Sequence, residues 1–248
     1  MRRTAFNVML VTVSLTLAGC APKRPPEVGA YRWVDERTAL ADLRARAAAL
    51  KTLSAECGIT LTRADGESVQ FDGALVLENP NHVRLRAWKF NRAVFDLTLN
   101  DDGLWVMTLD DPNRREQVLP ATLRAADFLR ELSLFTGGFF TQEPPPKTEV
   151  RGGTLLLTRE TTHGLLHCEA DRATLTPRRF YSEAQGAGEG RFELKLSKYR
   201  EVNGIPWALR LEAVSEMGRV AVEQRDVEIN GELAPQAFVP PKRAERRP

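Results

Sequence analysis

The fold of this chain is decided by residues 71–87, which read FDGALVLENPNHVRLRA. Apolar or small residues recur at every second position, at Phe71, Gly73, Leu75, Leu77, Val83, Leu85 and Ala87. A period of two is typical of strands that bury one face. The stretch therefore predicts two consecutive antiparallel strands joined by a short turn.

The same alternation continues along most of the chain. Phe95, Leu97 and Leu99 alternate with polar residues, and a strong turn signal at residues 101–103 precedes Trp105 and Met107. Further strands are predicted at residues 154–160, 164–170, 191–199, 205–213 and 219–229. Many short strands with one apolar face predict a mainly β fold, either a strongly curved antiparallel sheet or an unclosed β-barrel.

Two segments show helical spacing instead. Residues 35–53 carry apolar side chains three and four positions apart, with Asp35 as a plausible N-cap and Cys57-Gly58 as the end of the element. Residues 122–135 repeat this pattern up to Gly137-Gly138, which is expected to stop the helix. We expect two or three helices that cover the concave side of the sheet as a lid.

Residues 1–19 have the layout of a secretory signal peptide. Two arginines precede an apolar stretch that is shorter than the ~20 residues needed to cross a bilayer. The stretch ends in Leu17-Ala18-Gly19-Cys20, which resembles the lipobox of bacterial lipoproteins. That resemblance implies that Cys20 is acylated and that several acyl chains anchor the protein to a membrane. The alternative is an ordinary signal peptide followed by an incidental cysteine.

Removal of residues 1–19 leaves 229 residues. Residues 20–34 are predicted to hold the acylated cysteine and a linker, in which prolines favour extended conformations. Residues 35–241 are interpreted as one domain. Residues 242–248 form a basic tail, interpreted as solvated, with contact to anionic lipid as the alternative. The mature chain balances 33 basic and 33 acidic side chains, so no nucleic-acid partner is expected.

The sequence shows no catalytic or metal-binding pattern. His163 and His167 lie four apart in a predicted strand, which separates them by ~13 Å, too far for one metal ion. The glycine-rich residues 186–190 precede a strand, whereas a phosphate-binding loop precedes a helix. We therefore expect no metal, no cofactor and no enzymatic activity. Cys57 and Cys168 leave two interpretations open: a disulfide, or two small buried side chains.

Four motifs in the predicted domain resemble those of the LolA/LolB-type lipoprotein carriers, in the same order. Residues 65–85 look like their early hairpin and the Pro-Asn-x-x-Arg strand after it, and residues 99–106 are similar to their Ser-Asp-Gly-x-x-Leu-Trp hairpin. Residues 199–206 are similar to their Tyr-x-x-Val-(Asn/Asp)-Gly-x-x-Pro hairpin, and residues 238–241 to their terminal Phe-x-x-Pro-Pro. The resemblance covers nearly all of the predicted domain.

This resemblance implies an unclosed β-barrel that holds an apolar cavity under a helical lid and shields acyl chains. Two features depart from the soluble carriers. Asn79 stands where those carriers have an arginine that helps to hold the lid, and the lipobox argues against a soluble shuttle. The membrane-anchored members are therefore the closer analogue. They carry a projecting loop with an exposed apolar residue, which here corresponds to Trp88 and Phe90.

Trp88 and Phe90 are accordingly predicted to contact the bilayer or to receive cargo, with an ordinary hairpin whose aromatic residues pack inward as the alternative. The residues expected to line the cavity are Phe71, Leu75, Leu85, Phe95, Leu97, Trp105, Met107, Phe128, Leu132, Phe192, Leu194 and Trp207. Each of them fits a filled core equally well.

The leading functional hypothesis is an outer-membrane lipoprotein, facing the periplasm, that binds acyl chains or lipid during lipoprotein or lipid trafficking. The outer membrane is favoured because Ala21, and not aspartate, follows Cys20. The alternative is a non-catalytic interaction module of an envelope complex, which would use Phe139-Phe140 or a strand edge. The expected partners are the membrane and acyl chains or lipoproteins in the first case, and an envelope protein in the second.

Overall fold

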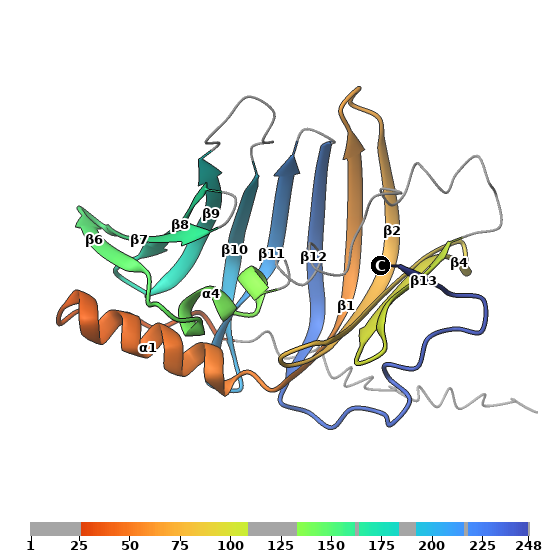
Figure 1. The fold of residues 1–248 in the computed structure, drawn as a ribbon, viewed down its shortest axis with the longest axis horizontal. Coiled ribbons are helices and arrows are strands. Elements are labelled where there is room, and N and C mark those ends of the chain that lie inside the picture. The colour runs from red at the N-terminus through yellow and green to blue at the C-terminus, as the bar shows by residue number, and fades with distance from the viewer. Residues whose placement is uncertain (1–25, 109–132, 162–163, 184–191, 216–217, 248) are drawn as a thin grey trace, which may run out of the picture.

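The computed structural model describes residues 26–108, 133–161, 164–183, 192–215 and 218–247. These residues form one antiparallel sheet of thirteen strands in the order β13-β5-β4-β3-β2-β1-β12-β11-β10-β9-β8-β7-β6. The two outermost strands, β13 and β6, do not pair with each other, so the sheet is strongly curved but unclosed (Figure 1). The predicted fold class is thereby confirmed.

The strands of the first half are β1 (Thr52–Arg63), β2 (Ser68–Glu78), β3 (His82–Lys89), β4 (Arg92–Asn100) and β5 (Gly103–Thr108). The later strands are β6 (Lys147–Arg151), β7 (Thr154–Thr161), β8 (Gly164–Asp171), β9 (Thr176–Glu183), β10 (Glu193–Val202), β11 (Ile205–Ser215), β12 (Gly218–Ile229) and β13 (Glu245–Arg247). Two helices are described, α1 (Glu36–Ala49) and α4 (Gly138–Thr141). Neither is long and apolar enough to span a membrane. The predicted helix at residues 122–135 lies outside the described residues except for its last three positions.

The first predicted helix is correct at its start and wrong at its end. The Asp35 side chain caps α1 by accepting a hydrogen bond from the Thr38 N–H at 2.7 Å. The helix then ends at Ala49, and Cys57-Gly58 lies in the middle of β1. The error arose because Leu50 and Leu53 continue the helical spacing, while Leu53 also begins a period of two that runs through β1.

Two asparagines fix the point where α1 gives way to β1. The Asn79 Nδ2 donates to the Leu50 carbonyl at 2.7 Å. The Asn230 Oδ1 accepts from the Lys51 N–H at 2.8 Å, and its Nδ2 donates to the Ala49 carbonyl at 2.9 Å. These bonds satisfy backbone groups that the end of a helix leaves without partners. Asn79 therefore anchors the end of α1 in this chain.

Four strands were not predicted: β1, whose residues were partly assigned to the helix, and β6, β9 and β13. The residues of β6 and β13 are mostly charged and exposed, so neither strand has an apolar face to reveal it. The interpretation of residues 242–248 as a solvated tail is wrong for Glu245–Arg247, which pair with β5. The unpaired N–H and C=O groups of an edge strand explain why even a charged segment adds to it.

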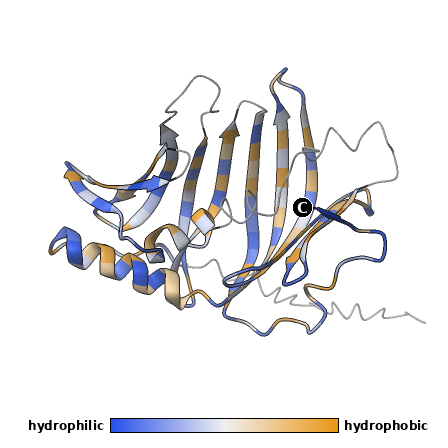
Figure 2. Ribbon diagram, viewed as in Figure 1, coloured by the Kyte–Doolittle hydropathy of each residue, from blue (hydrophilic) through white to orange (hydrophobic). Residues whose placement is uncertain are grey.

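The inner face of the sheet, against which α1 and α4 lie, carries two hydrophobic clusters. Apolar and polar positions alternate along the strands in Figure 2. The first cluster fills β1–β5 and includes Leu53, Leu77, Leu97 and Leu104. The second joins α1 and α4 to β7–β10. Phe135 packs against both clusters and so marks their boundary.

The outer face of β3–β5 is also covered. Asp96 is only 1% exposed and binds the guanidinium of Arg84, with an Nη2–Oδ2 distance of 2.8 Å. Arg84 in turn donates to the Ala237 carbonyl at 3.2 Å, and Asn100 donates to the Phe238 carbonyl at 3.1 Å. The chain that follows β12 therefore runs over this face before it adds β13 to the edge.

His82 contacts side chains of β2, of the β4–β5 turn and of the chain after β12. Its ring nitrogens lie 3.0 Å from the Glu78 carboxylate and 3.1 Å from that of Asp101, and its ring lies 5.3 Å from that of Phe238. The hydrogen bond with Glu78 raises the pKa of His82, and the one with Asp101 raises it further against the effect of burial. The protonated ring is thus favoured in the folded state.

This geometry predicts a pH-dependent contribution to stability. Because the folded pKa is raised, the stabilisation is complete below the unfolded pKa of about 6.5 and is lost as the pH rises through the folded value. We expect His82→Gln to lower the urea midpoint at about pH 5.5 and to change it much less at about pH 8.5. An equal loss at both pH values would contradict the assignment.

Candidate functional site

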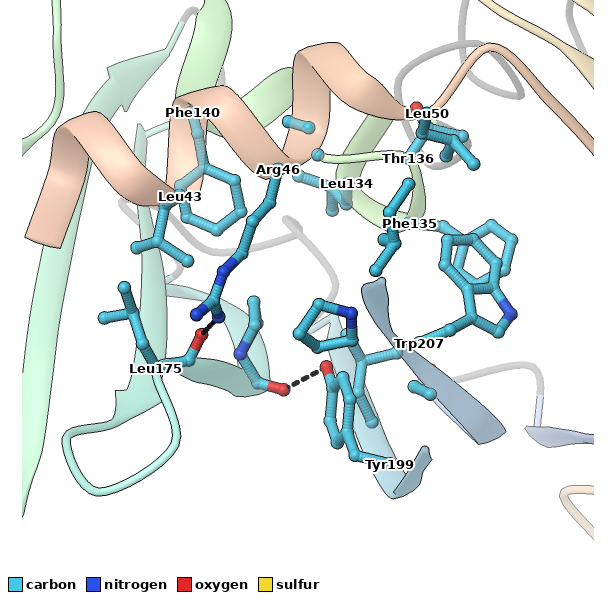
Figure 3. A pocket seen from close by; sticks show the side chains of 17 residues that line it. Leu43, Arg46, Leu50, Leu134, Phe135, Thr136, Phe140, Leu175, Tyr199 and Trp207 are labelled. Carbon is cyan, nitrogen blue, oxygen red and sulfur yellow. Dashed lines mark hydrogen bonds between the residues drawn. The ribbon is translucent and has the colours of Figure 1, made fainter. Parts of the chain in front are cut away.

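A cavity of about 70 Å³ lies between α1, residues 134–140 and the ends of β9–β11 nearest α1 (Figure 3). Its wall is lined by Leu43, Arg46, Ala47, Leu50, Leu134, Phe135, Thr136, Gly137, Phe140, Leu175, Pro177, Leu196, Tyr199, Ile205, Pro206, Trp207 and Ala208. Most of these side chains are apolar. The cavity lies where the two hydrophobic clusters meet, and Phe135 and Trp207 form an edge-to-face pair at its border, with ring centroids 4.7 Å apart.

The two most polar side chains of the wall are already engaged. Arg46 donates to the Leu175 carbonyl at 2.7 Å, and the Tyr199 hydroxyl donates to the Pro177 carbonyl (Figure 3). Burial raises the pKa of Tyr199 well above its ordinary value and lowers the pKa of Arg46. These groups therefore hold the wall together and leave an apolar interior, which suits a hydrocarbon ligand.

The helical cover of the cavity is held by modest apolar contacts. Ala39 and Leu43 are the buried side chains of α1, and Leu40 and Ala47 pack against the second cluster while partly buried. Polar contacts reinforce it. Arg44 donates to the Phe140 carbonyl at 2.8 Å and binds Glu143 at 3.2 Å, which joins α1 to α4 and the chain after it.

A larger groove, of about 680 Å³, is also lined by Leu134, Thr136 and Gly137. It shares Ala47, Leu50 and Gly137 with the cavity and adds polar groups that include Asn79 and Arg159. Gly137 adopts a φ of +85°, and a Cβ there would lie 2.6 Å from the Cβ of Ala47. Glycine is needed at this position because α1 and the covering segment touch through it.

Of the twelve predicted cavity residues, Trp207 lines the cavity in the described part of the chain. Phe71, Leu75, Phe95 and Leu97 are buried in the first hydrophobic cluster, with Leu85 packed against it. Leu194 is buried in the second cluster, and Phe192 packs against that cluster. Phe128 and Leu132 lie outside the described residues.

The placement of Trp105 and Met107 on the inner face is wrong. Leu104 and Val106 of the same strand are the residues buried in the first cluster. Alternate residues of a strand point to opposite faces, so Trp105 and Met107 lie on the outer face. Sequence alone gave both faces of β5 similar hydrophobicity.

The residues that sequence analysis missed come from element ends and turns. Leu43 and Leu50 belong to the apolar stripe of the predicted helix, so a signal for them existed. Leu175 has a φ of +51° in the β8–β9 turn, and Tyr199 follows Lys198, which has a φ of +55°. Their inward positions depend on these irregular backbone conformations, which the alternating pattern does not reveal.

The predicted loop residues lie at the β3–β4 hairpin. Phe90 is 88% exposed, so the alternative in which both aromatic residues pack inward is wrong for it. Trp88 is half-buried and borders a shallow hollow of about 580 Å³, where Gly58 leaves space by lacking a side chain. The Lys89 ammonium lies 5.6 Å from the centre of the Phe90 ring. An exposed phenyl ring beside a cation is therefore present at this tip.

The predicted protein-contact site at Phe139-Phe140 is buried in the structure. Phe139 and Phe140 are buried and pack on Phe180, so they offer no surface to a protein partner.

Cys57 and Cys168 are free, buried thiols in different hydrophobic clusters, which decides against a disulfide. Burial raises the pKa of Cys57 to about 11. His163 lies outside the described residues, and within the described ranges no three His, Cys, Asp or Glu side chains are arranged to hold a metal ion.

Solved structures with a similar fold are known. A LolA superfamily protein from Nitrosomonas europaea superposes with a TM-score of 0.54 at 12% identity, over 81% of this chain and 97% of that one. A domain assigned to outer membrane lipoprotein sorting, from Vibrio parahaemolyticus, superposes with a TM-score of 0.51 at 11% identity, over 82% and 95% of the two chains. No family model matches the chain, and no curated protein matches its sequence. The predicted resemblance is thus confirmed for the fold, which this chain shares with these two structures.

Proposed function

We propose that this protein is a non-catalytic lipoprotein that binds acyl chains in the cavity between α1 and β9–β11 and takes part in lipoprotein or lipid trafficking. Its proposed anchor is the acylated Cys20, and its proposed location is the periplasmic side of the outer membrane. The observation that carries the proposal is the apolar cavity at the boundary of two hydrophobic clusters, under α1, whose buried side chains are Ala39 and Leu43. The shared fold with a lipoprotein-sorting domain supports it.

The present cavity is smaller than the roughly 300–1,000 Å³ of typical ligand sites. Uptake of an acyl chain therefore requires the cover to move away from the sheet. Each methylene transferred from water gains about 0.8 kcal/mol, and this gain counts against the cost of separating α1, which is held by apolar contacts and by Arg46.

The test is lipid binding by protein that lacks residues 1–20, purified without detergent. We expect native mass spectrometry to detect bound lipid and a fluorescent fatty acid to bind. Phe135→Ala should raise the affinity for the fatty acid, because removal of the ring at the boundary of the clusters enlarges the cavity.

Val239→Ala is the control, since it removes an apolar side chain from an exposed site to which no role in binding is assigned. The proposal fails if the unaltered protein carries no lipid and binds no fatty acid. Equal affinities for the two variants would instead show that binding occurs elsewhere than at the cavity.

The exposed Phe90 supports an additional proposal, that the β3–β4 tip contacts the bilayer or incoming cargo. We expect Phe90→Glu to reduce acyl-chain transfer between vesicles and the protein by about tenfold, since a charge replaces an apolar contact. Asn91→Glu adds the same charge to the neighbouring position and is expected to have a smaller effect. Unchanged transfer by Phe90→Glu would contradict this role.

A further inference from the structure

The sheet is incompletely paired between β9 and β10. These strands pair only at Tyr181, Phe180 and Arg179 of β9, opposite Glu193, Leu194 and Lys195 of β10. Beyond this point β9 bends away from β10 (Figure 1). Pro177, which has no N–H to donate, and Lys198, whose φ is +55°, account for the end of the ladder. We call the unpaired stretch, residues 176–178 of β9 and 197–202 of β10, the seam.

The seam borders the cavity. Pro177 contributes to the cavity wall from the β9 side, and Tyr199 from the β10 side. Among the described hydrogen bonds, the only one between these two stretches runs from the Tyr199 hydroxyl to the Pro177 carbonyl. The seam therefore lies directly against the cavity wall.

The N-terminal residues 26–31, which we call the strap, lie along the free edge of β10 at the seam. Glu27 forms an antiparallel bridge and a 3.1 Å ion pair with Arg200, and the Glu201 N–H donates to the Pro26 carbonyl at 2.9 Å. The Tyr31 N–H donates to the Ala173 carbonyl in the β8–β9 turn at 2.6 Å. The predicted linker is thus docked onto the domain from residue 26, and the strap spans both sides of the seam.

The docked strap limits the distance between the proposed anchor and the seam. Six residue steps separate Cys20 from Pro26, and a fully extended chain covers at most about 3.6 Å per step, or about 22 Å in all. The eleven residues of β11 alone extend about 36 Å from the seam end of the sheet to the other end. An acylated Cys20 therefore holds the seam close to the bilayer.

We propose that acyl chains enter the cavity from the anchoring membrane through the seam, and that the strap must leave the edge of β10 for them to pass. This inference rests on the proposed acyl-chain binding. The ligand chemistry is an acyl chain, supplied either by a phospholipid or by an acylated protein. The strap is held by two backbone contacts and one exposed ion pair with β10, so its release costs little compared with the unpairing of full-length strands.

The test locks the strap in place. Glu27 and Arg200 are bridge partners in an antiparallel pair, so their separation suits a disulfide between Glu27→Cys and Arg200→Cys. The acylated full-length protein is reconstituted in phosphatidylethanolamine–phosphatidylglycerol vesicles. Uptake is followed by the relief of self-quenching of an acyl-labelled phospholipid or, in a second arm, of a labelled diacylcysteine peptide. The faster arm identifies the source of the chain.

We expect the oxidised double variant to take up the label at least about tenfold more slowly and to recover on reduction. The matched control, Thr62→Cys with Ser68→Cys, places a disulfide between paired residues at the other end of the sheet and should not change the rate. Unchanged uptake with the strap locked would overturn the inference while leaving acyl-chain binding intact. If the unaltered protein takes up no label in either arm, the proposed function fails, and this inference with it.

Discussion

Trp207→Ala is expected to lower the free energy of unfolding by about 4 kcal/mol. Trp207 is 5% exposed, and its ring packs against Phe135 at the cavity border. Its Nε1 also donates to the Gln224 Oε1 at 3.1 Å, in a buried contact. Alanine would remove the ring and leave the Gln224 amide without its donor, so the loss combines a large cavity with an unsatisfied polar group.

Urea unfolding of the protein without its anchor measures this effect. Trp207→Phe keeps most of the packing and loses the hydrogen bond, so we expect a smaller loss of about 1–2 kcal/mol. Trp88→Ala at the half-buried hairpin serves as a matched control and should cost less than either cavity variant. A loss below about 1.5 kcal/mol for Trp207→Ala would show that the ring does not support the wall as described.

Arg159→Met is expected to cost about 3 kcal/mol and to loosen α4. The guanidinium donates to the carbonyls of Pro144 at 2.6 Å, Phe139 at 2.7 Å and Gln142 at 2.9 Å. It also lies 5.5 Å from the centre of the Phe139 ring. One buried side chain therefore holds the residues that follow the cavity cover, and its loss leaves three carbonyl groups without their donor.

Hydrogen exchange resolves this effect by position. The amide of Gln142, which donates to the Gly138 carbonyl, should exchange faster in the Arg159→Met variant, whereas amides of β1 should not change relative to global stability. Arg159→Lys should rescue only part of the loss, because an ammonium group cannot reproduce the fork of the guanidinium. Arg151→Met, at an exposed position of β6, is the control. Unaltered exchange at α4 would contradict the role of Arg159.

The pattern of alternating residues predicted the sheet well, because most strands bury one face. It identified β2–β4 and β10–β12 through residues such as Leu75, Leu97 and Leu194, whose burial the structure confirms. It failed where residues fit two periods, as at Leu53, and where strands carry charges, as in β13. Apolar spacing records burial, and an edge strand buries little.

The cavity was much harder to predict than the fold. Its lining comes from the C-terminal half of α1, from a turn with Leu175 at positive φ, and from the stretch of β10 beyond Lys198. Each apolar residue on the inner face carries the same sequence signal whether it fills the core or borders a void. The docking of the predicted linker through Glu27 could not be predicted either, because its partner, Arg200, lies 173 positions away in the sequence.

The two edge strands of the open sheet affect how copies of this protein associate when they are close together on a membrane. An uncovered strand is a template for another copy of the same chain, and proteins gathered on a surface meet edge to edge often. Here one end is occupied by the chain's own Glu245–Arg247, and the other presents Lys147, Glu149 and Arg151 in exposed positions. Because both edges of the open sheet are short and charged, we expect them to disfavour edge-to-edge pairing between neighbouring copies of this protein.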